Sequence, residues 1–275
     1  MNLFSKGPTL FIDTCAPVLQ IALSVPCGTS NDANNMKWQS ISLPCDSHHF
    51  HSSRMIPSIQ ALFEQFDITA SDLKAIGVNV GPGSFTGLRT GVVTTRALAQ
   101  FLPLSVYQFN TLELWAWHAM QGLQESIQSP AGNQPDTVAI YHDALRGRAF
   151  HAVYKINVAE NTLMLLEKPC LKLLTESPLR PGVTGAPSSE PLNLPPETKI
   201  LTSPSLQPWL ENRGYGLSFT PDTISTTAMM RDILESPQGE SHQIPWKNLS
   251  PLYLQEPSIT LKPGFVPLTP SRLVD

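Results

Sequence analysis

The alternation of apolar and polar positions divides the first third of the chain into strands followed by a helix. Apolar runs rich in β-branched residues predict three antiparallel strands at 9–14, 18–25 and 37–43. A helix is predicted next, over residues 52–66, because six apolar residues fall within an arc of about 120° around its axis: Met55, Ile56, Ile59, Leu62, Phe63 and Phe66. This order of elements predicts a mixed sheet that is covered by helices.

A glycine-rich loop, GPGSFTGLRTG, joins a predicted buried strand at 73–80 to a predicted helix at 86–101. Gly81 and Gly83 allow positive φ angles and the close approach of another group. Ser84 or Thr86 can cap the helix, and the amides at the helix start can hold a phosphate or a carboxylate. A tight turn without a ligand has the same composition, so the loop alone leaves both interpretations open.

Two other groups invite a metal or phosphate interpretation. Asp13, at the end of the first predicted strand, can hold a metal–phosphate complex or bond to amides of its own loop, and a single aspartate favours the second role. Three histidines lie close together in the sequence: His48, His49 and His51. Neighbouring side chains in a loop diverge, and no cysteine or carboxylate motif supplies the remaining ligands, so no metal site is predicted there.

Beyond the glycine-rich loop the pattern becomes less regular. Further strands are predicted at 103–107, 137–141, 149–156 and 162–166, and further helices at 111–121 and 227–235. The segment DALRGR, from residue 143 to 148, joins two of these strands as a hairpin turn would. Frequent proline from 169 to 208 predicts a long irregular connection, and a short ordered segment is expected at 250–255.

Composition limits the classes of protein to consider. A length of 275 residues suits two domains or one large one, and a hydrophobic content of 41% supports a real core. Charged residues make up 15% of the chain and the net charge is −4, which argues against a protein that holds nucleic acid by itself. The four dispersed cysteines favour neither a zinc site nor a disulfide framework. The sequence shows no signal peptide or membrane span, so we expect a cytoplasmic protein.

Four motifs together resemble one protein family. The longest is the run HSSRMIPSIQ followed by LKAIGVNVGPGSFTGLRTGV, between residues 51 and 99. FIDTC is similar to a strand end with the pattern DTS, with Cys15 in place of the serine. DALRGRAF is similar to DARRGEVY with Arg148 in place of glutamate, and PLYLQ to PxYLR with Gln255 in place of arginine. These residues resemble the bacterial TsaB family, also called YeaZ, of tRNA threonylcarbamoyladenosine biosynthesis proteins.

The resemblance implies a fold and a division of the chain. The family has an actin-like ATPase (ASKHA) fold, an α/β architecture of two related domains, each with a mixed five-stranded sheet flanked by helices. For this chain it implies an N-terminal domain over residues 1–110, which carries the partner-binding helices, and a second domain over 111–275. The second domain would contain the proline-rich insertion near 169–208 and an irregular C-terminal tail.

The resemblance also implies a function without catalysis. The family supplies a non-catalytic scaffold subunit of the complex that makes N6-threonylcarbamoyladenosine at position 37 of tRNA, and its catalytic sister TsaD needs this subunit for activity. The implied partners are TsaD, bound as a heterodimer, TsaE in the larger complex, and tRNA indirectly. When the chain is alone, the same patch could close a homodimer instead, because a self-complementary two-fold contact forms easily.

Two absences in the sequence agree with a non-catalytic subunit. The sister family places two metal-ligand histidines after the strand that corresponds to 103–107, and residues 108–116 contain none. The second domain lacks a glycine-rich nucleotide turn, and its nearest candidates are ILTSPS at 200–205 and TGA at 184–186. We therefore expect no metal and no cofactor. The alternatives are an ATPase or small-molecule kinase that uses Asp13 and the glycine-rich loop, and a peptidase, which no Ser-His-Asp spacing supports.

The candidate site residues form two groups. A vestigial phosphate loop is expected from Asp13, Thr14, Gly81, Gly83 and Ser84. A partner interface is expected on the helices at 52–66 and 86–101, which would pair with the matching helices of the sister protein over about 1,000 Å² or more. Its predicted contact residues are Met55, Ile59, Phe63, Thr86, Arg89, Thr90 and Val93. On this prediction, Ile59→Glu weakens the heterodimer and leaves the monomer folded.

Overall fold

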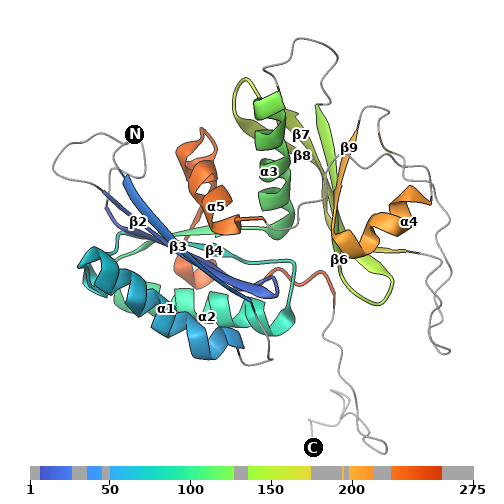
Figure 1. Ribbon diagram of the computed structural model, residues 1–275. Helices are drawn as coiled ribbons and strands as arrows, with labels where there is room; N and C mark the ends of the chain where they lie inside the picture. The colour runs from blue at the N-terminus through green and yellow to red at the C-terminus, as the bar shows by residue number, and fades with distance from the viewer. Residues whose placement is uncertain are drawn as a thin grey trace, which may run out of the picture.

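Two β-sheets with helices between and beside them form the framework of the computed structural model (Figure 1). The structure describes the following residues: 7–26, 36–44, 50–126, 136–174, 194, 198–212 and 224–255. Among the described helices, none is both long enough and apolar enough to cross a membrane.

The first sheet has six strands in the order β10-β5-β4-β1-β2-β3. Their bounds are Thr9–Asp13 for β1, Val18–Pro26 for β2, Met36–Pro44 for β3, Ala75–Asn79 for β4, Ser105–Phe109 for β5 and Gln243–Ile244 for β10. Strands β1, β4 and β5 are parallel, whereas β2, β3 and β10 pair antiparallel to their neighbours. The sheet is therefore mixed, as the sequence predicts.

The second sheet has four strands in the order β8-β7-β6-β9. Their bounds are Thr137–Asp143 for β6, Arg148–Asn157 for β7, Thr162–Leu173 for β8 and Lys199–Thr202 for β9. Strands β6, β7 and β8 form an antiparallel meander, and β9 pairs parallel to β6. The predicted turn between β6 and β7 is present, and Leu145, Arg146 and Gly147 within it all have positive φ angles.

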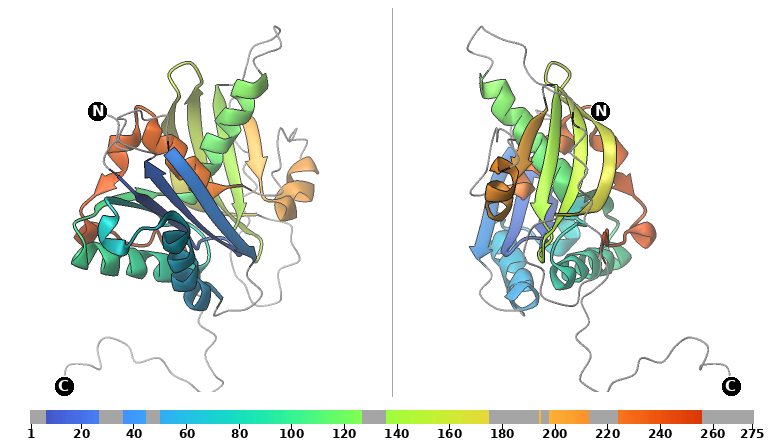
Figure 2. Two further views of the ribbon diagram at one scale, coloured as in Figure 1. Left: turned by 60° about the vertical axis from the view of Figure 1, so that its left-hand side comes forward. Right: turned by 90° about the vertical axis from the view of Figure 1, so that its right-hand side faces the viewer.

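Helices occupy both faces of the first sheet, as the two further views in Figure 2 also show. Helices α1 (Phe50–Phe66) and α2 (Phe85–Phe101) cover one face, and α3 (Thr111–Ser126) and α5 (Thr226–Glu235) lie between the two sheets (Figure 1). The remaining short helices are α4 (Gln207–Glu211) and the 3₁₀ turns η2 (Ala70–Asp72), η3 (Pro204–Leu206), η4 (Gly239–His242) and η5 (Trp246–Asn248).

Successive side chains of β1 pack in two different hydrophobic cores, one on each face of the sheet. Leu10 and Ile12 pack with Met55 and Leu62 under α1 and α2, whereas Phe11 points to the other face, as the period of two of a strand requires. That second core is shared by both sheets and the helices between them, and it includes Phe11, Ala22, Trp117, Val138, Ile140 and Met230. A third core covers the outer face of the second sheet.

The structure corrects the predicted strand counts. Five strands were expected in each sheet, but the first has six because β10 adds to β5, and the second has four within the described residues. The proline-rich connection begins later than expected, because β8 continues to Leu173. Most of 169–208, the tail beyond 255 and the TGA candidate at 184–186 lie outside the described residues, as do His48 and His49. The domain boundary at residue 110 stays a prediction.

Candidate functional site

The Asp13 carboxylate lies at the end of β1, where its side chain is 1% exposed. One oxygen, Oδ1, accepts a hydrogen bond from the Cys15 backbone amide at 2.7 Å. The other, Oδ2, accepts from Nδ2 of Asn79 at 2.9 Å. Because donors within the chain occupy both oxygens, Asp13 bonds to its own loop and to the neighbouring strand.

Asn79 and Thr111 connect this carboxylate to the glycine-rich loop. The Asn79 side chain also accepts from the Gly81 amide through Oδ1, at 3.0 Å. Thr111 begins α3, and its hydroxyl donates to the carbonyl of Pro82 at 2.7 Å. The sequence prediction missed Asn79 and Thr111, although a polar Asn79 within an apolar strand was a usable signal.

The glycine-rich loop packs directly against the turn after β1. The Ser84 amide donates to the carbonyl of Cys15 at 2.8 Å, and the Ser84 hydroxyl caps α2 by accepting from the Gly87 amide at 3.3 Å. A Cβ atom on Gly83 would clash with the Cys15 carbonyl, and Gly81 has a φ of 107° that glycine adopts most readily. The Ser84 amide, one of the candidate donors to a phosphate, therefore bonds to its own chain.

Thr14 completes the contact between β1 and α2. Its hydroxyl is buried and donates to the carbonyl of Gly87 at 2.7 Å. The structure thus brings together all five predicted loop residues, Asp13, Thr14, Gly81, Gly83 and Ser84. It joins them through hydrogen bonds within the protein.

The Cys15 thiol, which stands where the similar DTS pattern has serine, lies beside this network. The side chain is 3% exposed, and its sulfur donates to the carbonyl of Asn79 at 3.3 Å. Burial, followed by the charge of nearby Asp13, raises the pKa of the Cys15 thiol well above its ordinary value. Since the thiolate is the reactive form, this cysteine is suited to packing and not to nucleophilic chemistry.

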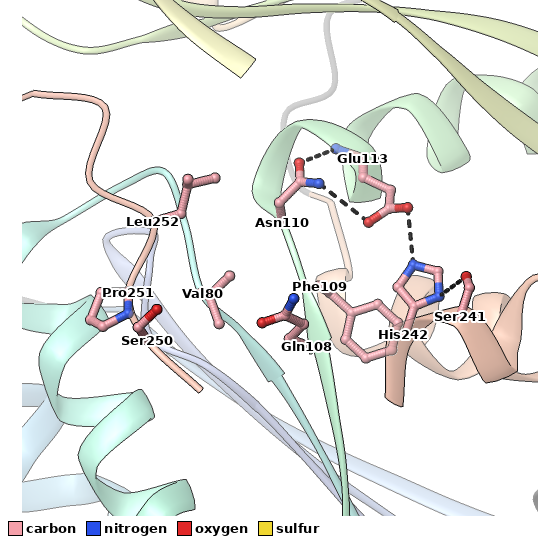
Figure 3. A pocket seen from close by; sticks show the side chains of 10 residues that line it. All are labelled: Val80, Gln108, Phe109, Asn110, Glu113, Ser241, His242, Ser250, Pro251 and Leu252. Atoms are coloured by element: carbon pink, nitrogen blue, oxygen red, sulfur yellow. Dashed lines mark hydrogen bonds and ion pairs between the residues drawn. The ribbon is translucent and has the colours of Figure 1, made fainter. Parts of the chain in front are cut away.

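A cavity of about 330 Å³ opens beyond the carboxyl ends of β4 and β5 (Figure 3). Clefts at this edge of a sheet are a common position for ligands in α/β proteins. Its walls come from the ends of both strands, the start of α3, the η4 turn and residues 250–252. The lining residues are Val80, Gln108, Phe109, Asn110, Glu113, Ser241, His242, Ser250, Pro251 and Leu252.

His242 and Glu113 form an ion pair on one wall of this cavity (Figure 3). Nε2 of His242 lies 3.0 Å from a Glu113 oxygen, and Nδ1 lies 3.1 Å from the Gln238 carbonyl. Both partners accept hydrogen bonds, so both bonds form only when the ring carries two protons. Burial works to lower the pKa of His242, but the hydrogen bond and charge of Glu113 outweigh it and raise that pKa.

This histidine lies close to the place where the resemblance puts metal ligands, just after β5. It comes from a distant segment, and its ring stacks on Phe109 with centroids 4.9 Å apart. Within the described part of the chain, no group of three or more His, Cys, Asp or Glu side chains lies together in a form that could hold a metal ion. The sequence had no signal for this pairing, because Glu113 and His242 are 129 residues apart.

Segment 200–205, the nearest candidate for the nucleotide turn that the second domain lacks, also bonds to its own chain. Asp143 accepts from the Ser205 hydroxyl at 2.6 Å and from the Leu145 amide at 2.7 Å. The Ser203 hydroxyl accepts from the Asp143 amide at 2.9 Å and lies 3.2 Å from Nδ1 of His142. Burial lowers the pKa of His142 to about 4, against the opposing charges of Asp143 and Asp13. These contacts tie the turn after β6 to the end of β9.

The predicted interface residues divide by exposure. Thr86, Arg89 and Val93 lie on the outer side of α2, with Val93 63% exposed, whereas Thr90 and Phe63 are half-buried. The prediction was wrong for Met55 and Ile59, which are 2% and 5% exposed and pack in the core beneath α1. Ile56, which the helical projection placed on the apolar face, is instead 46% exposed.

The chain resembles known proteins in sequence. A family model described as "TsaD: tRNA N6-adenosine threonylcarbamoyltransferase" matches residues 41–174. The tRNA threonylcarbamoyladenosine biosynthesis protein TsaB of Bacillus subtilis is 38% identical over 105 residues, which are 38% of this chain and 41% of that protein. The TsaB protein of Buchnera aphidicola is 25% identical over 125 residues, or 43% of this chain and 60% of that protein. The chain thus matches less than two thirds of the length of each relative.

The fold also resembles a solved structure. YeaZ from Pseudomonas aeruginosa superimposes with a TM-score of 0.62 over 90% of this chain and 100% of its own, at 16% sequence identity. At that identity the likeness shows the fold alone. It covers much more of this chain than the segments that align with the relatives in sequence. By its glycine-rich loop, its Asp13 strand end and the relatives named TsaB, the chain is similar to TsaB proteins, and its fold is similar to that of YeaZ.

Proposed function

We propose that this chain is a non-catalytic scaffold subunit in the synthesis of N6-threonylcarbamoyladenosine at position 37 of tRNA. Its relatives are named for threonylcarbamoyladenosine biosynthesis. The observation that carries the non-catalytic part is the engagement of the phosphate-loop groups by the protein itself: both oxygens of Asp13 and the amide of Ser84 bond to the chain. A phosphate could accept from the Ser84 amide only by displacing its bond to the Cys15 carbonyl.

In this proposal the chain binds a TsaD-type catalytic subunit as a heterodimer, with TsaE in the larger complex and tRNA held by the assembly. The outer sides of α1 and α2 support the choice of surface. The two helices lie side by side on one face of the first sheet, and Ile56 and Val93 expose apolar side chains there. Exposed apolar residues on adjacent helices suit a helical partner, which would bury them.

The first experiment measures complex formation with the purified TsaD-type subunit of the same organism. Val93→Glu places a charge on the proposed surface and is expected to weaken binding at least tenfold, because burying an unpaired charge is costly. Leu165→Glu is the matched control, since Leu165 is 45% exposed on β8 of the second sheet. Equal affinity of Val93→Glu and wild type would overturn this choice of surface.

The second experiment measures tRNA modification by the reconstituted complex with and without this chain. We expect modification to depend on the chain, and we expect the chain alone to hydrolyse no ATP. Modification that proceeds equally well without it would overturn the scaffold function. ATP hydrolysis by the chain alone, lost in Asp13→Asn, would instead support the kinase-like alternative.

A further inference from the structure

Residues 249–255, which we call the C-terminal segment, pack along α2 and against Val80, just after β4. Leu249 is fully buried in the core beneath α1 and α2. The Leu252 amide donates to the carbonyl of Val80 at 2.7 Å, and the Arg96 guanidinium donates to the carbonyl of Leu249 at 3.3 Å. After β10 of the first sheet and η5, the chain therefore places its PLYLQ motif beside the glycine-rich loop and α2.

This return places an aromatic side chain next to the outer side of α2. The ring of Tyr253 lies 4.9 Å from that of Phe85, centroid to centroid, and Tyr253 is still 44% exposed. The Arg89 guanidinium carbon lies over the same Phe85 ring, 5.6 Å from its centroid. We call Phe85, Arg89 and Tyr253 the aromatic–arginine cluster. It adjoins the outer side of α2 that carries Thr86 and Val93.

The charge of this region differs from that of the chain. The net charge of the protein is −4, yet α1 and α2 together contain the arginines Arg54, Arg89 and Arg96 and a single carboxylate, Glu64. Helix α2 itself has no acidic residue. A basic surface on an acidic protein complements an acidic partner surface, which it attracts and orients.

We propose that Tyr253 and the rest of the aromatic–arginine cluster extend the docking surface of α1 and α2, and that the cluster receives an acidic surface of the catalytic partner subunit. The inference rests on the proposed function and identifies which residues anchor the contact. Arginine and tyrosine are enriched among the residues that dominate binding energy. A partner carboxylate can pair with Arg89, while the exposed ring of Tyr253 supplies apolar area and a hydroxyl group.

The test compares affinities for the purified TsaD-type subunit by calorimetry. Tyr253→Ala is expected to raise Kd about tenfold or more, and Tyr253→Phe to change it by less than about threefold, because the ring remains. Arg89→Gln is expected to weaken binding and also to reduce its dependence on salt. Leu165→Ala on β8 is the control for a partly exposed apolar side chain remote from the surface. Unfolding midpoints of all variants verify that the chain stays folded.

The outcomes distinguish a failure of this inference from a failure of the proposed function. If wild type does not bind the catalytic subunit, the proposed function fails. If wild type binds and Val93→Glu does not, while Tyr253→Ala binds as well as wild type, the function stands and this inference fails. If Tyr253→Ala and Arg89→Gln keep their subunit affinity but weaken binding of tRNA to the assembled complex, RNA is the occupant and the inference is overturned.

Discussion

Two glycines are expected to respond in opposite ways to an added methyl group. Gly83→Ala forces a Cβ atom against the Cys15 carbonyl, so we expect a loss of about 1–3 kcal/mol of unfolding free energy, as in other overpacked sites. Gly122→Ala, within α3, meets no heavy atom within 4 Å and should add about 0.5–1 kcal/mol. Urea unfolding of both variants tests this, and equal effects would contradict the loop packing described above.

The His242–Glu113 pair predicts a pH-dependent contribution to stability. The folded-state pKa of His242 is raised above 6.5, so the folded protein holds this proton more tightly than the unfolded chain does. The contribution is fully present below pH 6.5 and is lost as the pH rises through the folded-state pKa. Each unit of pKa difference corresponds to about 1.4 kcal/mol.

The variant His242→Gln isolates this contribution. We expect its unfolding free energy to fall below that of wild type by more at pH 6 than at pH 9, at about equal ionic strength, because only the protonated ring forms both hydrogen bonds. Glu113→Gln should reduce the same difference. A difference between wild type and His242→Gln that does not change with pH would contradict the ion pair.

For single residues, the sequence predicted which side chains come together better than it predicted the hydrogen bonds that they form. Asp13, Thr14 and the glycine-rich loop converge as expected, because strand ends and helix starts have local signatures. The roles of Asn79, Thr111 and His242 depend on contacts between distant segments. No local pattern records such contacts, so only the fold shows that the predicted phosphate groups bond to one another.

Helix α1 offers a matched pair of isoleucines at the scale of an element. Ile59 is 5% exposed and packs under the helix, so Ile59→Ala is expected to cost about 2–4 kcal/mol of unfolding free energy. Ile56 is 46% exposed, and Ile56→Ala should cost less than about 0.5–1 kcal/mol. Chemical unfolding of the two variants checks the orientation of the helix. Equal losses would mean that α1 is rotated about its axis.

This pair also explains one limit of the sequence prediction. The apolar residues of α1 span a wide arc, and periodicity alone does not say which edge of that arc contacts the sheet. The ends of α1 and of its neighbour α2 were predicted to within two residues. Strands β9 and β10 were missed because they have four and two residues, and their pairing depends on the strands beside them rather than on their own composition.

The core between the sheets predicts that the molecule unfolds as one unit. Phe11 and Val138 come from different sheets, and Met230 from α5 packs in the same cluster with no exposure. Met230→Ala should therefore lower the stability of both sheets by about 2–5 kcal/mol. Single-tryptophan variants that retain Trp38 or Trp209 report on the first and second sheets, and their transitions should coincide. Separate midpoints would mean that the sheets unfold independently.

The position of β10 has a consequence for biosynthesis. The strand beside β5 comes from Gln243–Ile244, so a nascent chain on the ribosome presents the β5 edge unpaired until nearly all of the described chain has been translated. An open strand edge is a site for aberrant pairing and for chaperone capture. Nascent chains stalled before residue 243 should bind a trigger-type chaperone more strongly than chains stalled after the tunnel has released Ile244. The order of translation, and not only the order of strands, then determines when the β5 edge is paired and no longer open to aggregation.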